Sequence, residues 1–316
     1  MTVLIIGGSG FIGTAIARKL VATGTRVVVP ARRRDRAKHL ITLPTVDVVE
    51  ADVHDSGVLA GLVAGVRAVI NLVGILHGDR GNPYGERFKA AHVDLPRKVA
   101  EAAAAARVPR LLHMSALGVS ADAPSMYLRS KAAGEVVVKS AATGVAVTIF
   151  RPSVVFGRDD RFVNLFARMQ HLFPIIPLGR ANARLQPVHV EDVAQVFVNA
   201  LENHATFGRT YELAGPRAYS LREIVEFAGR ASGHPRKVID LPVSLAYLQA
   251  LMMEFAPFEI LSRDNLDSLK LDSICSQPVA PELGIVPVTM ESVMSSYLSG
   301  RLPRERYMRL RDRAGR

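Results

Sequence analysis

The chain has one cysteine among its 316 residues and no apolar run long enough to cross a membrane. A lone thiol, Cys275, excludes an internal disulfide and a cysteine-rich metal site, and it is typical of a reducing compartment. No stretch approaches the roughly 20 apolar residues that a transmembrane helix needs. The first apolar segment begins at Thr2, which leaves no room for a signal peptide ahead of it. We therefore expect a cytoplasmic protein.

Metal ligands and repeats are also lacking. His113, His171 and His189 do not follow the spacing of metal-binding histidines, and Asp159–Asp160 has no further ligand in evidence. The sequence shows no internal repeat and no low-complexity segment beyond the alanines at 102–106. It predicts no metal centre, and it is long enough for one large α/β domain or a domain with a smaller lobe.

Near the N-terminus the sequence contains a regular pattern of glycines. Residues 2–6 form a short apolar run, and Gly7, Gly10 and Gly13 follow it at intervals of three. Gly7 allows a sharp turn, Gly10 lets a pyrophosphate approach the backbone, and Gly13 allows the next helix to pack closely. A plain turn between strand and helix is the alternative, but this context favours dinucleotide binding.

The helix that follows the glycines begins with Phe11 and Ile12. Its first-turn N–H groups and its positive dipole end would face the phosphates of the dinucleotide.

The end of the second expected strand, 25–30, indicates which dinucleotide is bound. An acidic residue there would accept hydrogen bonds from the ribose of NAD, whereas arginine would pair with the 2′-phosphate of NADP. This chain has Arg32 and Arg33 and no carboxylate at the strand tip. The sequence predicts NADP(H), with NAD(H) as the less favoured cofactor and a simple charged loop as the alternative.

Strands and helices alternate through the first half of the chain, which predicts right-handed βαβ units and a parallel sheet. Continuous apolar strands fit a sheet that helices cover on both faces. The fold class is α/β, with a Rossmann-type doubly wound parallel sheet in residues 1–155. A smaller C-terminal α/β substrate lobe is expected mainly in 156–300, interleaved with the sheet domain. The expected strands are 2–6, 25–30, 46–51, 68–73, 110–114 and 145–150, and the expected helices begin at 11 and span 55–65, 86–107 and 127–143.

Two strand ends add candidate cofactor contacts. Asp52 and Val53 close the third strand, where an adenine ring would lie. Leu72, Val73 and Gly74 end the fourth strand and would form a wall for the ribose and adenine.

Prolines punctuate the second half of the chain, and one segment of it is notably apolar. Residues 241–261 are rich in Met and Phe and could line a pocket for a large apolar substrate, contact a membrane or partner, or form a buried helix of the lobe. The expected helices here are 161–172, 190–202, 220–232 and 289–299, and the expected strands are 209–213 and 236–241.

The residues for chemistry follow the fifth strand. Ser115 stands at its carboxyl end, and Tyr127 and Lys131 come four residues apart on the next helix, so they share a face. A nearby cation lowers the pKa of a phenol, so we expect Tyr127 to act as general acid or base. Ser115 would hydrogen-bond the reacting carbonyl or alcohol, and Lys131 could also hold the nicotinamide ribose.

These residues resemble the short-chain dehydrogenase/reductase superfamily, in its extended and atypical branches, over nearly the whole chain. The similarity includes Arg151-Pro152-Ser153-Val154-Val155-Phe156-Gly157. In that superfamily this loop passes the nicotinamide end of the cofactor, which implies cofactor contacts for Pro152 and Val154.

Segments 127–135 and 156–166 are more specifically similar to the NADPH-binding accessory subunit family of respiratory complex I and its bacterial relatives. This resemblance implies bound NADPH, without established turnover in that family. Three functions follow as hypotheses. The first is an oxidoreductase for a hydrophobic carbonyl or quinone-related compound. The second is an NADPH-binding accessory or assembly factor, and the third is a nucleotide-sugar epimerase or dehydratase, which the apolar second lobe makes less favoured.

The last 16 residues, 301–316, are strongly basic. They carry seven Arg against two acidic residues, a net +5 of the chain's +11. Interleaved apolar residues favour a membrane surface or a protein partner, and no nucleic-acid motif is present. A solvated terminus without a partner is the alternative. Peripheral association with the inner membrane face is therefore possible for an otherwise cytoplasmic protein.

Overall fold

The structure, a computed structural model, describes residues 1–254 and 261–298. The basic segment 301–316 lies outside the described residues. The chain forms two compact units, each built from segments that are distant in sequence. The first unit comprises Met1–Ser153, Val190–Leu213 and Cys275–Val286, and the second comprises Val154–His189, Ala214–Ile274 and the chain from Pro287 onward.

A seven-stranded sheet forms the centre of the first unit, and every neighbouring pair of strands in it is parallel. The strand order is β11-β6-β5-β4-β1-β2-β3, so the chain winds outward in both directions from β1. The bounds are β1 Thr2–Ile6, β2 Arg26–Ala31, β3 Val46–Glu50, β4 Ala68–Asn71, β5 Arg110–Met114, β6 Ala146–Pro152 and β11 Thr210–Leu213. In such a sheet, ligands bind beyond the carboxyl ends of the strands, at the point where the order reverses.

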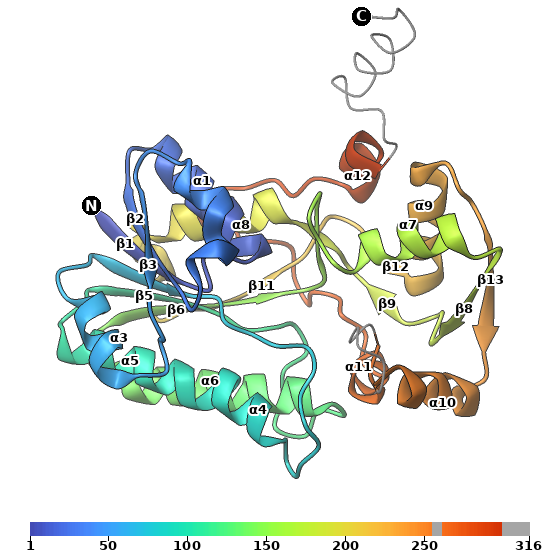
Figure 1. The fold of residues 1–316 in the computed structure, drawn as a ribbon, viewed down its shortest axis with the longest axis horizontal. Coiled ribbons are helices and arrows are strands. Elements are labelled where there is room, and N and C mark those ends of the chain that lie inside the picture. The colour runs from blue at the N-terminus through green and yellow to red at the C-terminus, as the bar shows by residue number, and fades with distance from the viewer. Residues whose placement is uncertain (255–260, 299–316) are drawn as a thin grey trace, which may run out of the picture. The chain divides into compact units, whose positions relative to one another are not determined.

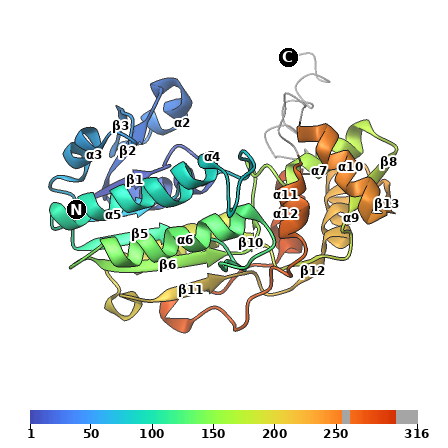
Figure 2. The same ribbon diagram turned by 90° about the horizontal axis from the view of Figure 1, so that it is seen from below.

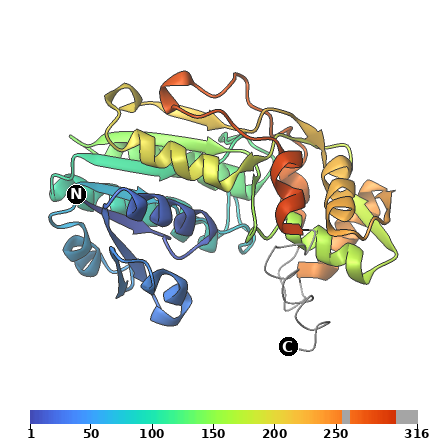
Figure 3. The same ribbon diagram turned by 90° about the horizontal axis from the view of Figure 1, so that it is seen from above.

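Helices cover both faces of this sheet, which confirms the predicted α/β class. Helices α1 (Phe11–Ala22) and α8 (Val190–Ala200) pack together on one face, and α3 (Ser56–Val63), α5 (Leu95–Ala105) and α6 (Met126–Ala141) lie on the other (Figures 1–3). The buried apolar faces of β1, β4 and β5 explain this arrangement, because a sheet buried on both faces needs a helix layer on each. A short helix, α2 (Lys38–Ile41), follows β2.

The expected helix 86–107 is interrupted and the expected strand 68–73 is shorter than predicted. The helix consists of α4 (Glu86–Lys89), a π-helical turn (Ala90–Asp94) and α5. Strand β4 ends at Asn71 because the side-chain Oδ1 of Asn71 accepts a hydrogen bond from the N–H of Val73 at 3.2 Å, which turns the chain.

The second unit packs helices on short strand pairs. Its larger core joins α7 (Val163–Leu172), α9 (Leu221–Ser232) and α12 (Met290–Leu298) with the buried side of a parallel pair, β8 (Ile175–Gly179) and β13 (Lys237–Leu241). The predicted helices and strand 236–241 are confirmed, whereas β8 was not predicted. The remaining strands are β7 Val155–Phe156, β9 Arg184–Leu185, β10 Val188–His189 and β12 Tyr219–Ser220.

Of the apolar segment 241–261, residues 241–254 and 261 are described, and the helix within them is only partly buried. In α10 (Val243–Glu254), only Ala246 and Ala250 are buried, against α11 (Arg263–Ser268) and its neighbours. Leu245, Leu248 and Met252 are 50%, 53% and 69% exposed. Across residues 1–254 and 261–298, no helix combines the length and apolarity that crossing a bilayer requires.

Candidate active site

The glycine turn between β1 and α1 leaves no room for side chains on its inner side. Gly7 has a φ of +84°, which L side chains rarely adopt. A Cβ at Gly13 would lie 2.5 Å from the Cα of Gly8 and 2.6 Å from the carbonyl oxygen of Gly7. Gly8, which the sequence analysis did not single out, is equally constrained, because its Cβ would lie 2.9 Å from the side chain of Val29 on β2.

The start of α1 is open toward solvent. Its N-cap, Gly10, is exposed and offers no side chain, and the first turn contains no acidic residue. A Cβ at Gly10 would touch only the carbonyl oxygen of Gly7. The first-turn amides, including those of Phe11 and Ile12, therefore have no side-chain acceptor at the cap, which leaves this helix end free for an anion.

Arg32 and Arg33 directly follow β2, and both are exposed. Within the described residues, no ion pair joins either guanidinium to a carboxylate. Asp52 is exposed beyond β3, where its Oδ1 accepts a hydrogen bond from the N–H of His54 at 3.0 Å. Val53 beside it packs against the core of the first unit.

Lys131 reaches the predicted wall at the end of β4. Its side chain is 3% exposed, and its Nζ donates to the carbonyl oxygens of Val73 at 3.3 Å and Met114 at 3.1 Å. A Cβ at Gly74 would stand 3.1 Å from this Nζ, so glycine keeps space for the ammonium. Leu72 is held by a hydrogen bond from its N–H to the carbonyl of Ile6 at 2.9 Å. The structure therefore brings Val73 and Gly74 together with Lys131, whereas Leu72 lies beside Gly7 of the glycine turn.

Ser115 lies just beyond β5, next to the carbonyl that Lys131 binds. Its N–H donates to the carbonyl of Phe150 at 2.7 Å, which fixes the backbone. Its side chain is 3% exposed, and its Oγ is buried without a hydrogen-bond partner. An unpaired buried hydroxyl costs about 1–3 kcal/mol, so this atom is suited to a ligand. Tyr127, on the next helix, packs against a small buried cluster that includes Ala116, the residue after Ser115.

The expected effect of Lys131 on Tyr127 is wrong for the protein without a ligand. Burial raises the pKa of Tyr127 to about 12, rather than a cation lowering it. Burial also lowers the pKa of Lys131 to about 8, with Glu135 opposing that shift. The reason is that the ammonium is directed at two main-chain carbonyls, while the phenol lies among apolar groups and rings.

This site geometry agrees with the comparison to known protein families. A model of the NAD dependent epimerase/dehydratase family matches residues 3–214. The chain belongs to this family.

Similar proteins were found among known sequences and among solved structures. A subunit named NADH dehydrogenase [ubiquinone] 1 alpha subcomplex subunit 9, from Mus musculus, is 29% identical over 91% of this chain and 77% of its own. A ceramide reductase from Caulobacter vibrioides is 30% identical over 76% of this chain and 73% of its own. A dTDP-glucose 4,6-dehydratase structure from Streptomyces venezuelae, 21% identical, covers 98% of this chain and 100% of its own with a TM-score of 0.75, which shows the shared fold.

The residues of this epimerase/dehydratase family member fit a nicotinamide dinucleotide. The uncapped start of α1 would hold the pyrophosphate on backbone N–H groups. The unpaired Ser115 Oγ and the Lys131 ammonium, at the ends of β5 and β4, would serve the other end of the cofactor and the reacting group. Pro152 ends β6 and its carbonyl accepts from Leu117 at 2.9 Å, whereas Val154 packs in the second unit.

His92 is a site residue that the sequence analysis missed. It is 1% exposed in the π-helical turn, and its Nε2 accepts from the N–H of Ile75 at 3.0 Å. Its Nδ1 therefore carries the proton and donates to the Oγ of Ser130 at 2.8 Å. The ring meets that of Tyr127 edge-on at 5.5 Å. The π-turn places His92 against α6 and brings these groups together. Its local sequence signal is Pro96, which cannot donate the helical hydrogen bond to the carbonyl of His92 four residues earlier.

A second buried histidine, His113, was considered only as a metal ligand. Its Nδ1 lies 3.3 Å from the amide nitrogen of Asn71, and its Nε2 is buried without a partner. Burial lowers the pKa of His113 to about 3, so the ring is neutral. No cluster of three or more possible metal ligands occurs anywhere in residues 1–254 and 261–298.

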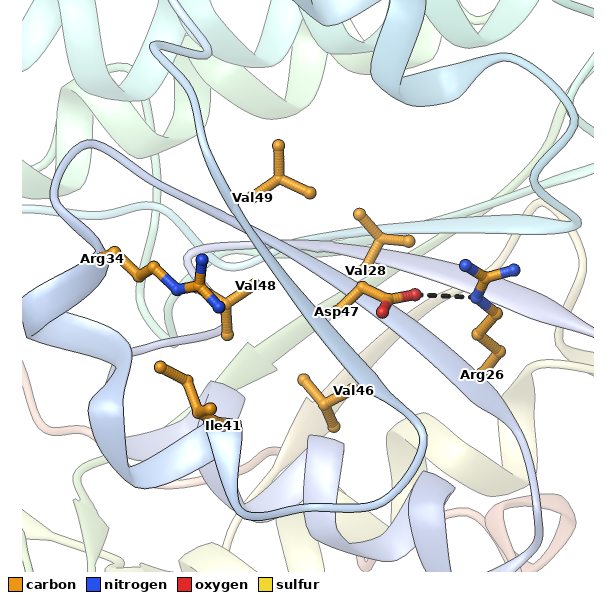
Figure 4. A pocket seen from close by; sticks show the side chains of 8 residues that line it. All are labelled: Arg26, Val28, Arg34, Ile41, Val46, Asp47, Val48 and Val49. Carbon is orange, nitrogen blue, oxygen red and sulfur yellow. Dashed lines mark hydrogen bonds and ion pairs between the residues drawn. The ribbon is translucent and has the colours of Figure 1, made fainter.

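A hollow of about 430 Å³ lies elsewhere, along the edge strand β3 (Figure 4). Valines of β2 and β3 line it with Ile41 and Arg34, and an exposed ion pair joins Arg26 to Asp47 at 2.7 Å. None of the predicted site residues lines this hollow. It therefore has no part in the site described above.

Proposed function

We propose that the protein is an NADP(H)-dependent oxidoreductase that reduces or oxidises a hydrophobic carbonyl or quinone-related compound. The observation that carries this proposal is the buried, unpaired Oγ of Ser115, next in the chain to the Met114 carbonyl that Lys131 binds, because a polar atom in that state is suited to a ligand. Reductases among the relatives, including the ceramide reductase, support a reductive reaction on an apolar molecule.

In the reductive direction, the chain's residues supply the proton and hold the carbonyl. A bound nicotinamide supplies the hydride. Ser115 donates a hydrogen bond to the carbonyl oxygen, and the Tyr127 hydroxyl donates its proton to that oxygen as the alcohol forms. Its pKa of about 12 keeps Tyr127 protonated at neutral pH but makes it a weak acid, so proton transfer to the forming alkoxide, the stronger base, drives this step. Lys131, whose ammonium is directed at the carbonyls of Val73 and Met114, would hold the ribose.

The test is single-turnover oxidation of bound NADPH across a panel of ketones and quinones. Tyr127→Phe keeps the ring that contacts His92 and Phe88 but removes the hydroxyl. We expect turnover to fall by about 10²–10⁴-fold, as for loss of a general acid, with NADPH affinity unchanged. If the Phe variant turned over as fast as the wild type, the role of Tyr127 would be wrong.

NADP(H) as the particular cofactor rests on Arg32 and Arg33. Both guanidinium groups are exposed at the tip of β2 and have no ion-pair partner among the described residues. An unpaired arginine pair at this strand end is suited to the 2′-phosphate, which a bidentate guanidinium binds well.

A second candidate function is that of an accessory or assembly subunit in which NADPH is a structural ligand. Relatives in mouse and in Neurospora crassa, the latter named NADH-ubiquinone oxidoreductase 40 kDa subunit, are complex I subunits. The exposed apolar stripe of α10, formed by Leu245, Leu248 and Met252, supports a protein partner. The basic segment 301–316 would aid a peripheral membrane position.

The two candidates differ in how the nucleotide exchanges. A structural ligand should remain bound through purification and should not exchange with added labelled NADPH within hours. A catalytic cofactor should exchange within seconds and be oxidised when a substrate is added. Measuring the exchange rate of radiolabelled NADPH by rapid filtration separates these outcomes.

A further inference from the structure

Three functional side chains share one face of α6. Tyr127, Lys131 and Glu135 are four residues apart, and Lys131 and Glu135 are only 3% and 4% exposed. A lysine and a glutamate at this spacing commonly form an ion pair along a helix. In the described part of the chain, however, no ion pair joins Lys131 to Glu135.

Each of the two residues uses other partners instead. Lys131 donates to the carbonyls of Val73 and Met114 at 3.3 and 3.1 Å. Glu135 accepts two hydrogen bonds from Arg151 on β6, at 2.7 Å from Nε to Oε1 and 2.6 Å from Nη2 to Oε2. This bidentate geometry occupies both carboxylate oxygens and is among the strongest that a side-chain pair can form.

We propose that Arg151 is a positioning residue that holds the Glu135 carboxylate away from Lys131, so that the ammonium stays on the two carbonyls beside Ser115. This inference rests on the proposed function, in which Lys131 holds the ribose of the cofactor. It adds a role for the arginine of segment 151–157 that does not involve contact with the cofactor.

The other titratable groups that face Lys131 are neutral, so Glu135 has the largest influence on the charge of Lys131. His92 faces Lys131 from the π-helical turn and His113 faces it from β5, and burial keeps both rings neutral by lowering the pKa to about 2 and about 3. Tyr127 on α6 is also neutral, since its pKa is raised to about 12. Glu135 is the carboxylate that acts on Lys131, and it opposes the lowering of the lysine pKa to about 8. A closer Glu135 would return that pKa toward its ordinary value of 10.5.

The test is the pH dependence of unfolding, which needs no substrate. Because the pKa of Lys131 is about 8 in the folded chain and 10.5 when unfolded, the unfolded chain binds more protons between these values. Stability therefore rises with pH across that window. The contribution of Lys131 is the difference from the same protein carrying Lys131→Met. The variants to compare are Arg151→Met and the double variant Arg151→Met with Glu135→Gln.

We expect the stability of the wild type to rise with pH across this window through Lys131. Arg151→Met should lose most of this rise in stability, and the double variant should regain it. Loss followed by recovery cannot come from general damage, because the double variant lacks the same guanidinium. A full rise in Arg151→Met would overturn the inference, as would a double variant that does not regain it.

If Arg151→Met does not fold, Arg151→Lys keeps a cation but offers no two-point clamp, and it should lose part of the rise. A wild-type rise in Arg151→Lys would then contradict the inference. This test measures unfolding and not turnover. If Tyr127→Phe turned over as fast as the wild type, the proposed reaction would be refuted, but the role of Arg151 in holding Glu135 could still be confirmed by the unfolding measurements.

Discussion

At Gly13, backbone atoms of the glycine turn occupy the space that the Cβ of any other residue would need. The Cα of Gly8 and the carbonyl oxygen of Gly7 would lie at 2.5 and 2.6 Å, and neither can move like a flexible side chain. We expect Gly13→Ala to lower the free energy of unfolding by about 1–3 kcal/mol, as overpacking does, and to abolish NADPH binding by moving the turn. Denaturant unfolding and NADPH titration measure the two effects.

Gly61 supplies the matched control. It lies inside α3, and a Cβ there would meet nothing within 4 Å. Gly61→Ala should raise stability by about 0.5–1 kcal/mol, because alanine is the better helix former. NADPH binding should be unchanged. Equal loss in both variants would mean that the tight contact at Gly13 is not the cause.

The two buried histidines make a prediction at acid pH. Their pKa values are lowered from 6.5 to about 2 for His92 and about 3 for His113, so both stay neutral in the folded chain. Below pH 6.5 the unfolded chain takes up protons that the folded chain does not. Stability is therefore complete above that pH and falls below it, by about 1.4 kcal/mol per pH unit for each histidine.

Unfolding measured between pH 7 and 5 checks this prediction in the wild type and in His113→Gln. The variant should lose stability less steeply, by one histidine's share. Identical slopes in the two proteins would show that His113 gains its proton without unfolding.

The sequence predicts Ser115, Tyr127 and Lys131 as catalytic residues from their order and spacing along the chain. It could not identify His92 or Gly8, because their roles depend on contacts with segments distant in sequence. The same limit explains the wrong expectation for the pKa of Tyr127. Helical spacing places a lysine near a tyrosine, but it does not show that the ammonium is directed at the carbonyls of Val73 and Met114.

At the scale of elements, Arg110 joins the start of β5 to its neighbours. It is 2% exposed, and its guanidinium donates to the carbonyls of Ala146 and Ala200 and to the hydroxyls of Thr148 and Thr206. Within residues 1–254 and 261–298 its charge has no carboxylate partner, and it lies instead at the carbonyl end of α8, where a cation is favoured.

Arg110→Met should leave several of these acceptors unpaired and lower the free energy of unfolding by about 2–4 kcal/mol. The control is Arg26→Met, which removes an exposed ion pair with Asp47 and should cost less than about 1 kcal/mol. Denaturant unfolding compares them. Equal losses would mean that Arg110 does not join these elements.

The apolar pattern of the sequence was sufficient to predict most helices and strands, but not the places where they are interrupted. Strand β5 begins and ends at the predicted residues, 110–114. The continuous helix expected over 86–107 disregards Pro96, which cannot donate to the carbonyl of His92 and so interrupts the regular helix at the π-turn. Strand β8 was missed because Pro177 lies in its interior, and proline usually argues against a strand.

At the scale of the whole molecule, the chain leaves the first unit after Ser153 and returns to it twice. A strand at 209–213 was predicted, but nothing in its own residues indicates that it becomes the seventh strand of the parallel sheet, beside β6. Such pairing is decided by long-range packing, which a single sequence does not reveal. The alternation of strands and helices, in contrast, predicted the α/β class directly.

The central claim is that a phosphate-bearing dinucleotide binds at the open end of α1, with its 2′-phosphate on Arg32 and Arg33. The most direct measurement is a calorimetric titration of the full chain with NADPH and with NADH. We predict one saturable site with tighter binding of NADPH. In Arg32→Ala with Arg33→Ala, we predict NADPH affinity weaker by about 1.5–3 kcal/mol or more, with NADH affinity almost unchanged. No binding of either nucleotide, or an equal loss for both in the double variant, would contradict the account.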